Sequence, residues 1–179
     1  MELIDTFLDS MEMDLQKQTY DQGKYETYIL GSAEVVGLMC LKVFVKGNNQ
    51  KYEQLKHEAM RLGSAFQKVN FLRDLKDDNT ILNRTYFPGV NLENFNEDSK
   101  AQIIKEIEED FRIAYQGIVK LPIEAKFGVY TAYVYYRNLL KKLKNTPSHE
   151  IGNARIRVSN YTKAGLLAQS FVTYKLKLV

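Results

Sequence analysis

Residues 62–78 read LGSAFQKVNFLRDLKDD and place Asn70, Asp74 and Asp78 at successive spacings of four, with Gln67 three residues before Asn70. Residues three or four apart share one face of an α-helix, so these four side chains form a row that we call the polar stripe. Magnesium suits such a row because it keeps several waters and is usually shared between a few protein oxygens and a substrate phosphate. The stretch therefore predicts a long helix with a metal-assisted diphosphate site.

A solvated charged face is the alternative interpretation of the same pattern. Against it, Asp74, Asp77 and Asp78 crowd the end of the predicted helix, where the helix dipole disfavours each negative charge by a few tenths to about 1 kcal/mol. A neighbouring cation would offset that cost. An EF-hand is excluded, because the mid-loop glycine and the closing glutamate are absent from residues 74–85.

The polar stripe continues into Arg84-x-Tyr86-x-Pro88, and the whole segment resembles the second aspartate-rich motif of the squalene and phytoene synthase family. That motif has the form Gln-x-x-Asn-x-x-Arg-Asp-x-x-x-Asp, followed by Arg-x-Tyr-x-Pro. Looser similarity extends over nearly the whole chain. The resemblance implies an all-α helical bundle of the isoprenoid synthase type, formed by residues 1–179 as a single domain.

The resemblance also implies an activity and a set of site residues. The activity is a prenyltransferase reaction of carotenoid biosynthesis, in which two molecules of geranylgeranyl diphosphate condense head to head to phytoene, although squalene and dehydrosqualene stay open as products. The required cofactor is Mg²⁺, with Mn²⁺ as a substitute. The implied catalytic residues are Asp74, Asp78 and Tyr136, the metal ligands are Asn70, Asp74 and Asp78, and the diphosphate contacts are Gln67, Arg73, Arg84, Tyr86 and Arg155.

A candidate prenyl pocket lies on the helix predicted for residues 25–45. Small residues beside larger apolar ones, namely Ala33, Gly37, Leu38 and Leu41, could form a slot for a prenyl tail. Close packing between helices explains the small residues equally well. Glu34 lies among them and must be paired or protonated if it is buried.

The family's first aspartate-rich motif has no convincing counterpart in this chain. Asp5 and Asp9 satisfy its spacing, but they lie directly before the segment that matches a later part of the family, so we interpret them as the polar face of an ordinary helix. We therefore expect the chain to match the C-terminal portion of a synthase, without its N-terminal helices. Self-association or an N-terminal segment would then complete the fold. A non-catalytic binding or assembly module that retains the fold is the alternative.

Composition narrows the class of protein further. The chain has 179 residues, 45% of them hydrophobic, and a net charge of +3, which argues against a dedicated nucleic-acid binder. From Arg137 to Val179 it carries nine basic residues and one acidic residue, a local charge of +8. This segment could contact an anionic membrane surface, or it could be a solvated basic face. The lone Cys40 and the acidic start, which is unlike a signal peptide, suggest a cytoplasmic protein, peripheral to a membrane if that contact exists.

Apolar residues recur at helical spacing almost throughout the chain. We expect helices over residues 3–19, 25–45, 51–78, 97–120, 123–144 and 160–177, separated by glycine, asparagine and proline punctuation. The helix over residues 25–45 approaches membrane-spanning length, but Glu34 and Lys42 favour a buried helix instead. The long connection over residues 79–98 should fold Arg84 and Tyr86 back over the phosphate end of the site.

Overall fold

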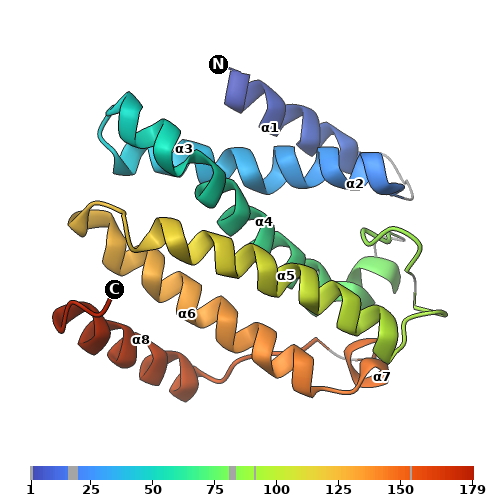
Figure 1. The fold of residues 1–179 in the computed structure, drawn as a ribbon. Coiled ribbons are helices and arrows are strands. Elements are labelled where there is room, and N and C mark those ends of the chain that lie inside the picture. Colours follow the sequence, from blue (N-terminus) through green and yellow to red (C-terminus); the bar gives the residue numbers. More distant parts are fainter. Residues whose placement is uncertain (1, 16–19, 81–83, 91, 154) are drawn as a thin grey trace.

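The computed structural model describes residues 2–15, 20–80, 84–90, 92–153 and 155–179. Its long segments are helical, which confirms the predicted all-α class (Figure 1). The elements in chain order are α1 (Glu2–Glu12), a 3₁₀ turn (Met13–Leu15), α2 (Gln22–Ile29), a π-helical segment (Leu30–Glu34), α3 (Val35–Phe44), α4 (Asn49–Thr80), α5 (Glu97–Ile118), α6 (Ile123–Asn145), α7 (Ser148–Ile151) and α8 (Asn160–Lys175).

The central element is α4, a 32-residue helix that contains the polar stripe. It packs against α3 and the π-helical segment in its N-terminal half and near its middle, and against α5 and α6 elsewhere. The prediction of a long helix over residues 51–78 is confirmed, with two more residues at each end. Because α4 touches so many elements, side chains from distant parts of the sequence meet on its surface.

The helix predicted over residues 25–45 is interrupted where it crosses α4. Five residues, Leu30–Glu34, adopt π-helical geometry between α2 and α3. The crossing is very close: a Cβ added to Gly37 would lie 2.5 Å from the Ala59 carbonyl oxygen, and one added to Gly63 would lie 2.3 Å from the Ala33 carbonyl oxygen. The small residues Ala33 and Gly37 therefore allow the two helices to pack closely, which is one of the two explanations that the sequence offers for them.

The remaining helices begin and end at recognisable sequence signals. Asn96 caps α5, and Ser99 completes a capping box with it. Pro122 precedes α6, and the Ser159 side chain accepts a hydrogen bond from the Thr162 amide at the start of α8. The predicted first helix ends at Glu12, since a 3₁₀ turn follows and residues 16–19 lie outside the described residues. The sequence interpretation missed α7, a single four-residue turn.

A buried ionic cluster joins α4 to α5. Lys68 and Asp110 are both buried, and the Lys68 Nζ lies 2.7 Å from an Asp110 carboxylate oxygen. Asp110 also accepts hydrogen bonds from Ser64 and Arg61, each at 3.3 Å. Glu34 faces this cluster from the π-helical segment, and its burial raises the pKa of its carboxyl above the ordinary value. A buried Glu34 must be paired or protonated, as expected from the sequence. Nearby cations offset its charge, and the raised pKa favours its protonated form.

The run Gln22–Phe44 is long and apolar enough to cross a membrane, judged by length and composition alone. In the structure it packs against α1 and α4, and 39% of its most apolar window is buried.

Candidate active site

The polar stripe lies on the side of α4 that meets α6. The Tyr136 hydroxyl of α6 donates a hydrogen bond to the Asn70 amide oxygen at 3.3 Å. One helical turn earlier on α4, the Phe66 ring stacks on the Tyr136 ring with a centroid separation of 4.1 Å. Tyr136 therefore contacts both an apolar and a polar part of α4, as a residue at the border of an amphiphilic site would.

Two arginines hold the Asp74 carboxylate. Arg73 donates to it through two nitrogens, at 2.9 and 2.5 Å, and Arg155 Nε lies 2.7 Å from Asp74 Oδ1. Hydrogen bonding to Asp74 raises the pKa of Arg73, so this guanidinium is firmly cationic. The fold thus brings together three predicted site residues, Arg73, Asp74 and Arg155, although Arg155 lies 81 positions after Asp74 in the sequence.

Asp78 has a different environment. Within the described part of the chain, its carboxylate has no hydrogen bond or ion pair. Burial raises the pKa of this carboxyl to about 6, and the negative charges of Asp74 and Asp77 contribute to the rise. A carboxylate whose charge is incompletely compensated is one that a cation would stabilise.

The predicted lid consists of Arg84 and Tyr86, and the structure places the two residues in different surroundings. Arg84 pairs with Asp14 at 2.9 Å and also donates to the Asp14 carbonyl oxygen. Tyr86 is buried, with its ring stacked on Phe71 at a centroid separation of 4.0 Å. The expectation is corrected for Tyr86, because its aromatic ring gains stability from burial in the core, whereas Arg84 lies at the end of the polar stripe, beside Asp78. Residues 81–83 and 91 of this connection lie outside the described residues.

Sequence reasoning missed Asp14 and Tyr28, which belong to this polar group. Asp14 receives the Arg84 guanidinium and also accepts a hydrogen bond from the Tyr28 hydroxyl at 3.0 Å. Asp14 has no spacing relationship to the stripe, so no local signal identified it. The Arg84 main-chain amide donates to the Asp78 carbonyl oxygen at 2.9 Å, which places this group at the end of the polar stripe.

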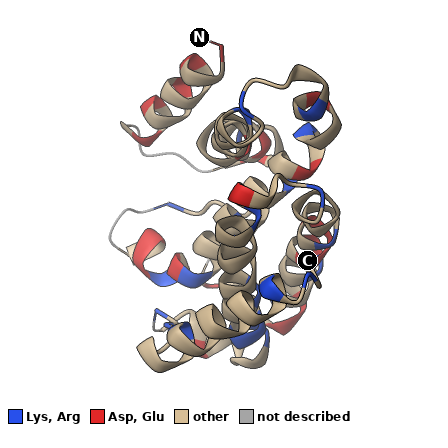
Figure 2. Ribbon diagram, turned by 90° about the vertical axis from the view of Figure 1, so that its left-hand side faces the viewer, with Lys and Arg blue, Asp and Glu red and all other residues tan. Residues whose placement is uncertain are grey.

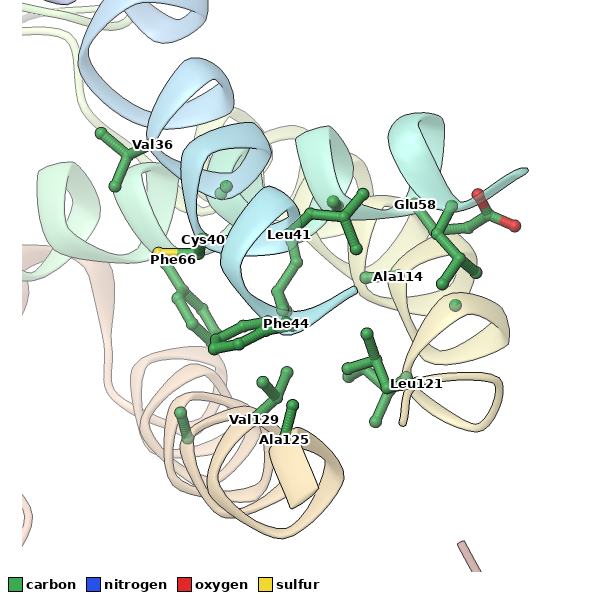
Figure 3. Close-up of a pocket in the computed structure, with 18 of the residues that line it drawn as sticks. Val36, Cys40, Leu41, Phe44, Glu58, Phe66, Ala114, Leu121, Ala125 and Val129 are labelled. Carbon is green, nitrogen blue, oxygen red and sulfur yellow. The ribbon is translucent and has the colours of Figure 1, made fainter. Parts of the chain in front are cut away.

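An apolar groove of about 580 Å³ lies between α3, α4, α5 and α6. Figure 3 shows Phe44 and Phe66 on one side of it, with Ala125 and Val129 of α6 opposite. Gln67 lines the groove and is also the first member of the polar stripe. The groove therefore leads along a single helix directly to the oxygen-bearing side chains.

Three of the four predicted pocket residues line this groove: Ala33, Gly37 and Leu41. The fourth, Leu38, does not line it. Leu38 is buried in a core cluster with Leu41, Val45, Tyr52 and Leu55, and two members of that cluster, Leu41 and Leu55, also line the groove. The wall formed by α6 was also missed, although Gly128 and Ala132 are the kind of small residues that leave room for a ligand.

The polar stripe offers oxygen ligands of the kind that magnesium prefers, but on one side of the ion only. In the residues that the structure describes, no group of three or more His, Cys, Asp or Glu side chains is arranged to hold a metal ion. The stripe does offer amide and carboxylate oxygens on one rigid face, including the carboxylate of Asp78, whose charge Arg84 and Arg155 compensate only in part. Magnesium is typically held by one or two carboxylates together with waters and substrate phosphates, so this donor set fits it.

Asp5 and Asp9 are both exposed on α1, whose acidic residues are visible along the helix in Figure 2. The buried contact of α1 is made instead by Ser10, which lies against Gly31 of the π-helical segment. The exposed positions of Asp5 and Asp9 agree with the prediction that they form the polar face of a helix.

Comparison with known proteins adds independent evidence. Residues 1–162 match the family model described as squalene/phytoene synthase. The chain is 28% identical to the 15-cis-phytoene synthase of Pantoea ananas over 153 residues, which are 76% of this chain and 48% of that protein. It is also 28% identical to the phytoene synthase of Arthrospira platensis over 176 residues, 84% of this chain and 56% of that protein. The chain thus spans about half the length of these curated relatives.

Solved structures show the same fold. The structure of TcSQS with the ligand BPH1237 superimposes with a TM-score of 0.71 at 16% identity, covering 99% of this chain and 60% of that one. A second TcSQS complex, with the ligand E5700, gives a TM-score of 0.70 at the same identity. The family match over residues 1–162 and this shared helical fold lead to one conclusion: the chain belongs to the squalene/phytoene synthase family.

Proposed function

We propose that this chain forms the second aspartate-rich half of the active site of a phytoene synthase, a magnesium-dependent prenyltransferase that condenses two molecules of geranylgeranyl diphosphate. One observation carries the proposal: an apolar groove and the polar stripe lie on the same helix and meet at Gln67. A prenyl diphosphate has the matching shape, since it joins a long apolar tail to a compact polyanion.

Each residue of the site has a role in this proposal. Asn70, Asp74 and Asp78 hold the metal ion, and Gln67 contacts the diphosphate or a water beside it. Arg73 and Arg155 now pair with Asp74, and exchange of this carboxylate for the substrate diphosphate would leave Asp74 to a cation. Arg84 is held near the end of the stripe by Asp14 and contributes positive charge there.

The chemistry follows from charge and water exclusion. Bound magnesium would supply positive charge to the departing diphosphate. The apolar groove keeps water away from the allylic cation that forms when the carbon–oxygen bond breaks, and the Phe44 and Phe66 rings that line it can stabilise positive charge through their faces. Tyr136 stacks on Phe66 and fixes the Asn70 amide, so it positions both parts of the site.

We further propose that ligands from outside these 179 residues complete the site. Two carboxylates and one amide on a single helix can hold a metal ion from one side only. The other side would come from a further segment of polypeptide, either in the same protein or in a partner copy. In either case, condensation requires that segment.

Equilibrium binding tests the half-site directly. Geranylgeranyl diphosphate should bind with Mg²⁺ and lose most of its affinity in EDTA, whereas geranylgeraniol, which lacks the diphosphate, should show no metal dependence. Asp78→Asn should remove the metal dependence, and Asp98→Asn, at an exposed position on α5, is the matched control. Metal-independent binding of the diphosphate, or unchanged binding by Asp78→Asn, would contradict the proposal.

A product assay with this chain, combined with its mass in solution, tests the second part. We expect binding without phytoene formation from a monomer. Phytoene formed by a monomer would show that the first metal-binding motif lies within the chain, and Asp9→Asn would then be the first variant to examine.

A non-catalytic binding or assembly module is the second candidate function. It is favoured by one observation, namely that Arg73 and Arg155 already neutralise Asp74. Absence of any magnesium-dependent binding of geranylgeranyl diphosphate would support this candidate over the enzyme.

A further inference from the structure

The π-helical segment contributes to a second cavity besides the apolar groove. This cavity has a volume of about 610 Å³ and is lined by residues of α2, the π-helical segment, α4 and α5. We call it the polar pocket. It shares no lining residue with the groove, although Ala33 of the groove and Glu34 of the polar pocket are adjacent in the sequence. Segments of π-helix are frequent at functional sites, so the polar pocket is a candidate for a ligand of its own.

A buried hydroxyl group in the wall of the polar pocket lacks a partner. Tyr25 is only 4% exposed, and its ring packs against Phe87 at a centroid separation of 6.0 Å. Its hydroxyl makes no hydrogen bond with any described residue. Burial raises the pKa of Tyr25, and the charges of Glu106 and Asp110 add to the rise, so the hydroxyl end lies on the side of the buried ionic cluster. Buried hydroxyl groups are normally hydrogen-bonded, and a molecule in the pocket could bond to this one.

The carboxyl group of Glu34 is the second group without a partner. Glu34 is half-buried and lines the pocket, yet within the described residues it makes neither a hydrogen bond nor an ion pair. The nearby cations are bonded to other carboxylates. Lys68 pairs with Glu106 and, at 2.7 Å, with Asp110, and Arg61 pairs with Asp110 at 3.3 Å. Glu34 is therefore the buried carboxyl group that a ligand could pair with.

The charge of the polar pocket indicates the sign of that ligand. Three acidic and two basic residues line it, a formal charge of −1: Glu26, Glu34, Glu106, Arg61 and Lys68. Asp110, which is bonded to both basic residues, adds a further negative charge. A cation would reduce this imbalance. A bare metal ion suits the pocket poorly, since no group of three or more His, Cys, Asp or Glu in the described part of the chain is arranged to hold one.

We propose that the polar pocket binds an organic ammonium ion, that is, a small amine with a protonated primary amino group. The ammonium group would donate hydrogen bonds to the Glu34 carboxylate and to the Tyr25 hydroxyl oxygen. The carbon chain of the amine would lie against Ile29 and Leu30, which also line the pocket. An anion is a poorer occupant, because Glu34 and the neighbouring carboxylates would repel it. This inference does not depend on the proposed catalytic function.

Calorimetric titration with three small molecules of equal chain length provides the first test. They are butylamine, which is cationic at neutral pH, 1-butanol, which is neutral, and butyrate, which is anionic. At constant ionic strength we expect butylamine to bind with a stoichiometry of one, and the other two not to bind. Saturating geranylgeranyl diphosphate should leave the affinity for butylamine unchanged, because the pocket and the groove share no lining residue.

Variants of the two unpartnered groups provide the second test. Glu34→Gln should weaken butylamine binding about tenfold or more, and Tyr25→Phe roughly two- to tenfold, since hydrogen bonds that involve a charged partner contribute more than neutral ones. The controls are Glu53→Gln, at an exposed position on α4, and Tyr161→Phe, at a position 93% exposed on α8. Both should bind like the wild type, and circular dichroism should show an unchanged helical content in all four variants.

The stability of the protein without butylamine separates a ligand-binding role of Tyr25 from a structural one. Tyr25→Phe removes a hydroxyl that has no partner, so in urea unfolding it should be at least as stable as the wild type. Added butylamine should then stabilise the wild type more than the variant. A variant that is less stable than the wild type without butylamine would show that the hydroxyl has a structural role, which would overturn its assignment to a ligand.

Four further results would overturn the proposal. Absence of butylamine binding would remove the ligand class, and preferential binding of butyrate would reverse the sign of the site. Equal weakening by Glu34→Gln and Glu53→Gln would show that the amine binds to surface carboxylates in general. Loss of butylamine binding on addition of geranylgeranyl diphosphate would place the amine in the groove instead of the polar pocket.

Discussion

The Tyr136 hydroxyl donates a hydrogen bond to the Asn70 amide oxygen at 3.3 Å and so joins α6 to the polar stripe of α4. The bond fixes the orientation of the Asn70 amide, because the oxygen must face the hydroxyl. The amide oxygen retains a second lone pair, which remains available to a cation. The position of α6 relative to α4 thus sets the orientation of Asn70, a proposed metal ligand.

Replacing Tyr136 with Phe tests this coupling. The stacking on Phe66 is retained, so we expect the free energy of unfolding to fall by only about 1 kcal/mol. Magnesium-dependent affinity for geranylgeranyl diphosphate should fall several-fold because the Asn70 amide is no longer oriented. The neighbouring Tyr135→Phe is the control, and calorimetric titration measures both. Unchanged affinity in Tyr136→Phe would assign this residue to packing alone.

Asp74 and Asp78 should respond differently to substitution. Asp78→Asn removes a crowded carboxylate, so we expect no loss of stability in metal-free buffer at neutral pH. Asp74→Asn weakens the pairing with Arg73 and Arg155, and we expect it to cost about 1 kcal/mol or less. Both should abolish magnesium-dependent diphosphate binding. A larger loss of stability, measured by urea unfolding in EDTA, would show that these aspartates are mainly structural.

The close crossing of α3 and α4 should not tolerate an added methyl group. Gly63→Ala would place its Cβ 2.3 Å from the Ala33 carbonyl oxygen, so the helices must separate, and we expect a loss of about 1–3 kcal/mol. Gly165→Ala is a matched control on α8, where nothing lies within 4 Å of the added atom. It should stabilise the chain by about 0.5–1 kcal/mol. Thermal unfolding compares the two, and equal effects would contradict the crossing.

The buried pair of Lys68 and Asp110 should be sensitive to the loss of one partner. Asp110→Ala leaves the Lys68 ammonium with only the partly exposed Glu106, and we expect a loss of about 3 kcal/mol or more. Glu109→Ala, which removes an exposed pair with Arg112, should leave stability nearly unchanged, because solvent screens the pair. Similar losses in the two variants would show that burial of the pair has no special effect.

Glu34 should make the stability of the chain depend on pH. Burial raises the pKa of Glu34 in the folded state, against the opposing effect of Arg61 and Lys68 and with a further rise from Asp110. Its contribution to stability is therefore complete below the unfolded pKa and is lost as the pH rises through the folded value. The wild type should lose stability relative to Glu34→Gln as the pH rises from 4 to 7. Urea unfolding of both proteins along this series measures the difference, and parallel profiles would contradict it.

The sequence by itself determined the helical fold and the polar stripe, because both depend on local periodicity. Spacings of three and four residues place Gln67, Asn70, Asp74 and Asp78 on one face of any helix that contains them. Cap and break signals such as Asn96, Pro122 and Ser159 act over a few residues, so they too could be interpreted without a structure.

Only the tertiary structure decided which residues meet. Leu38 and Leu41 are both apolar, three residues apart and buried in the same core cluster, yet only Leu41 also lines the groove, because the packing of α3 against its neighbours decides which side chains face it. The pairing of Arg155 with Asp74 and of Arg84 with Asp14 joins residues 81 and 70 positions apart. Contacts over such separations depend on how the helices pack, and local sequence carries no signal for them.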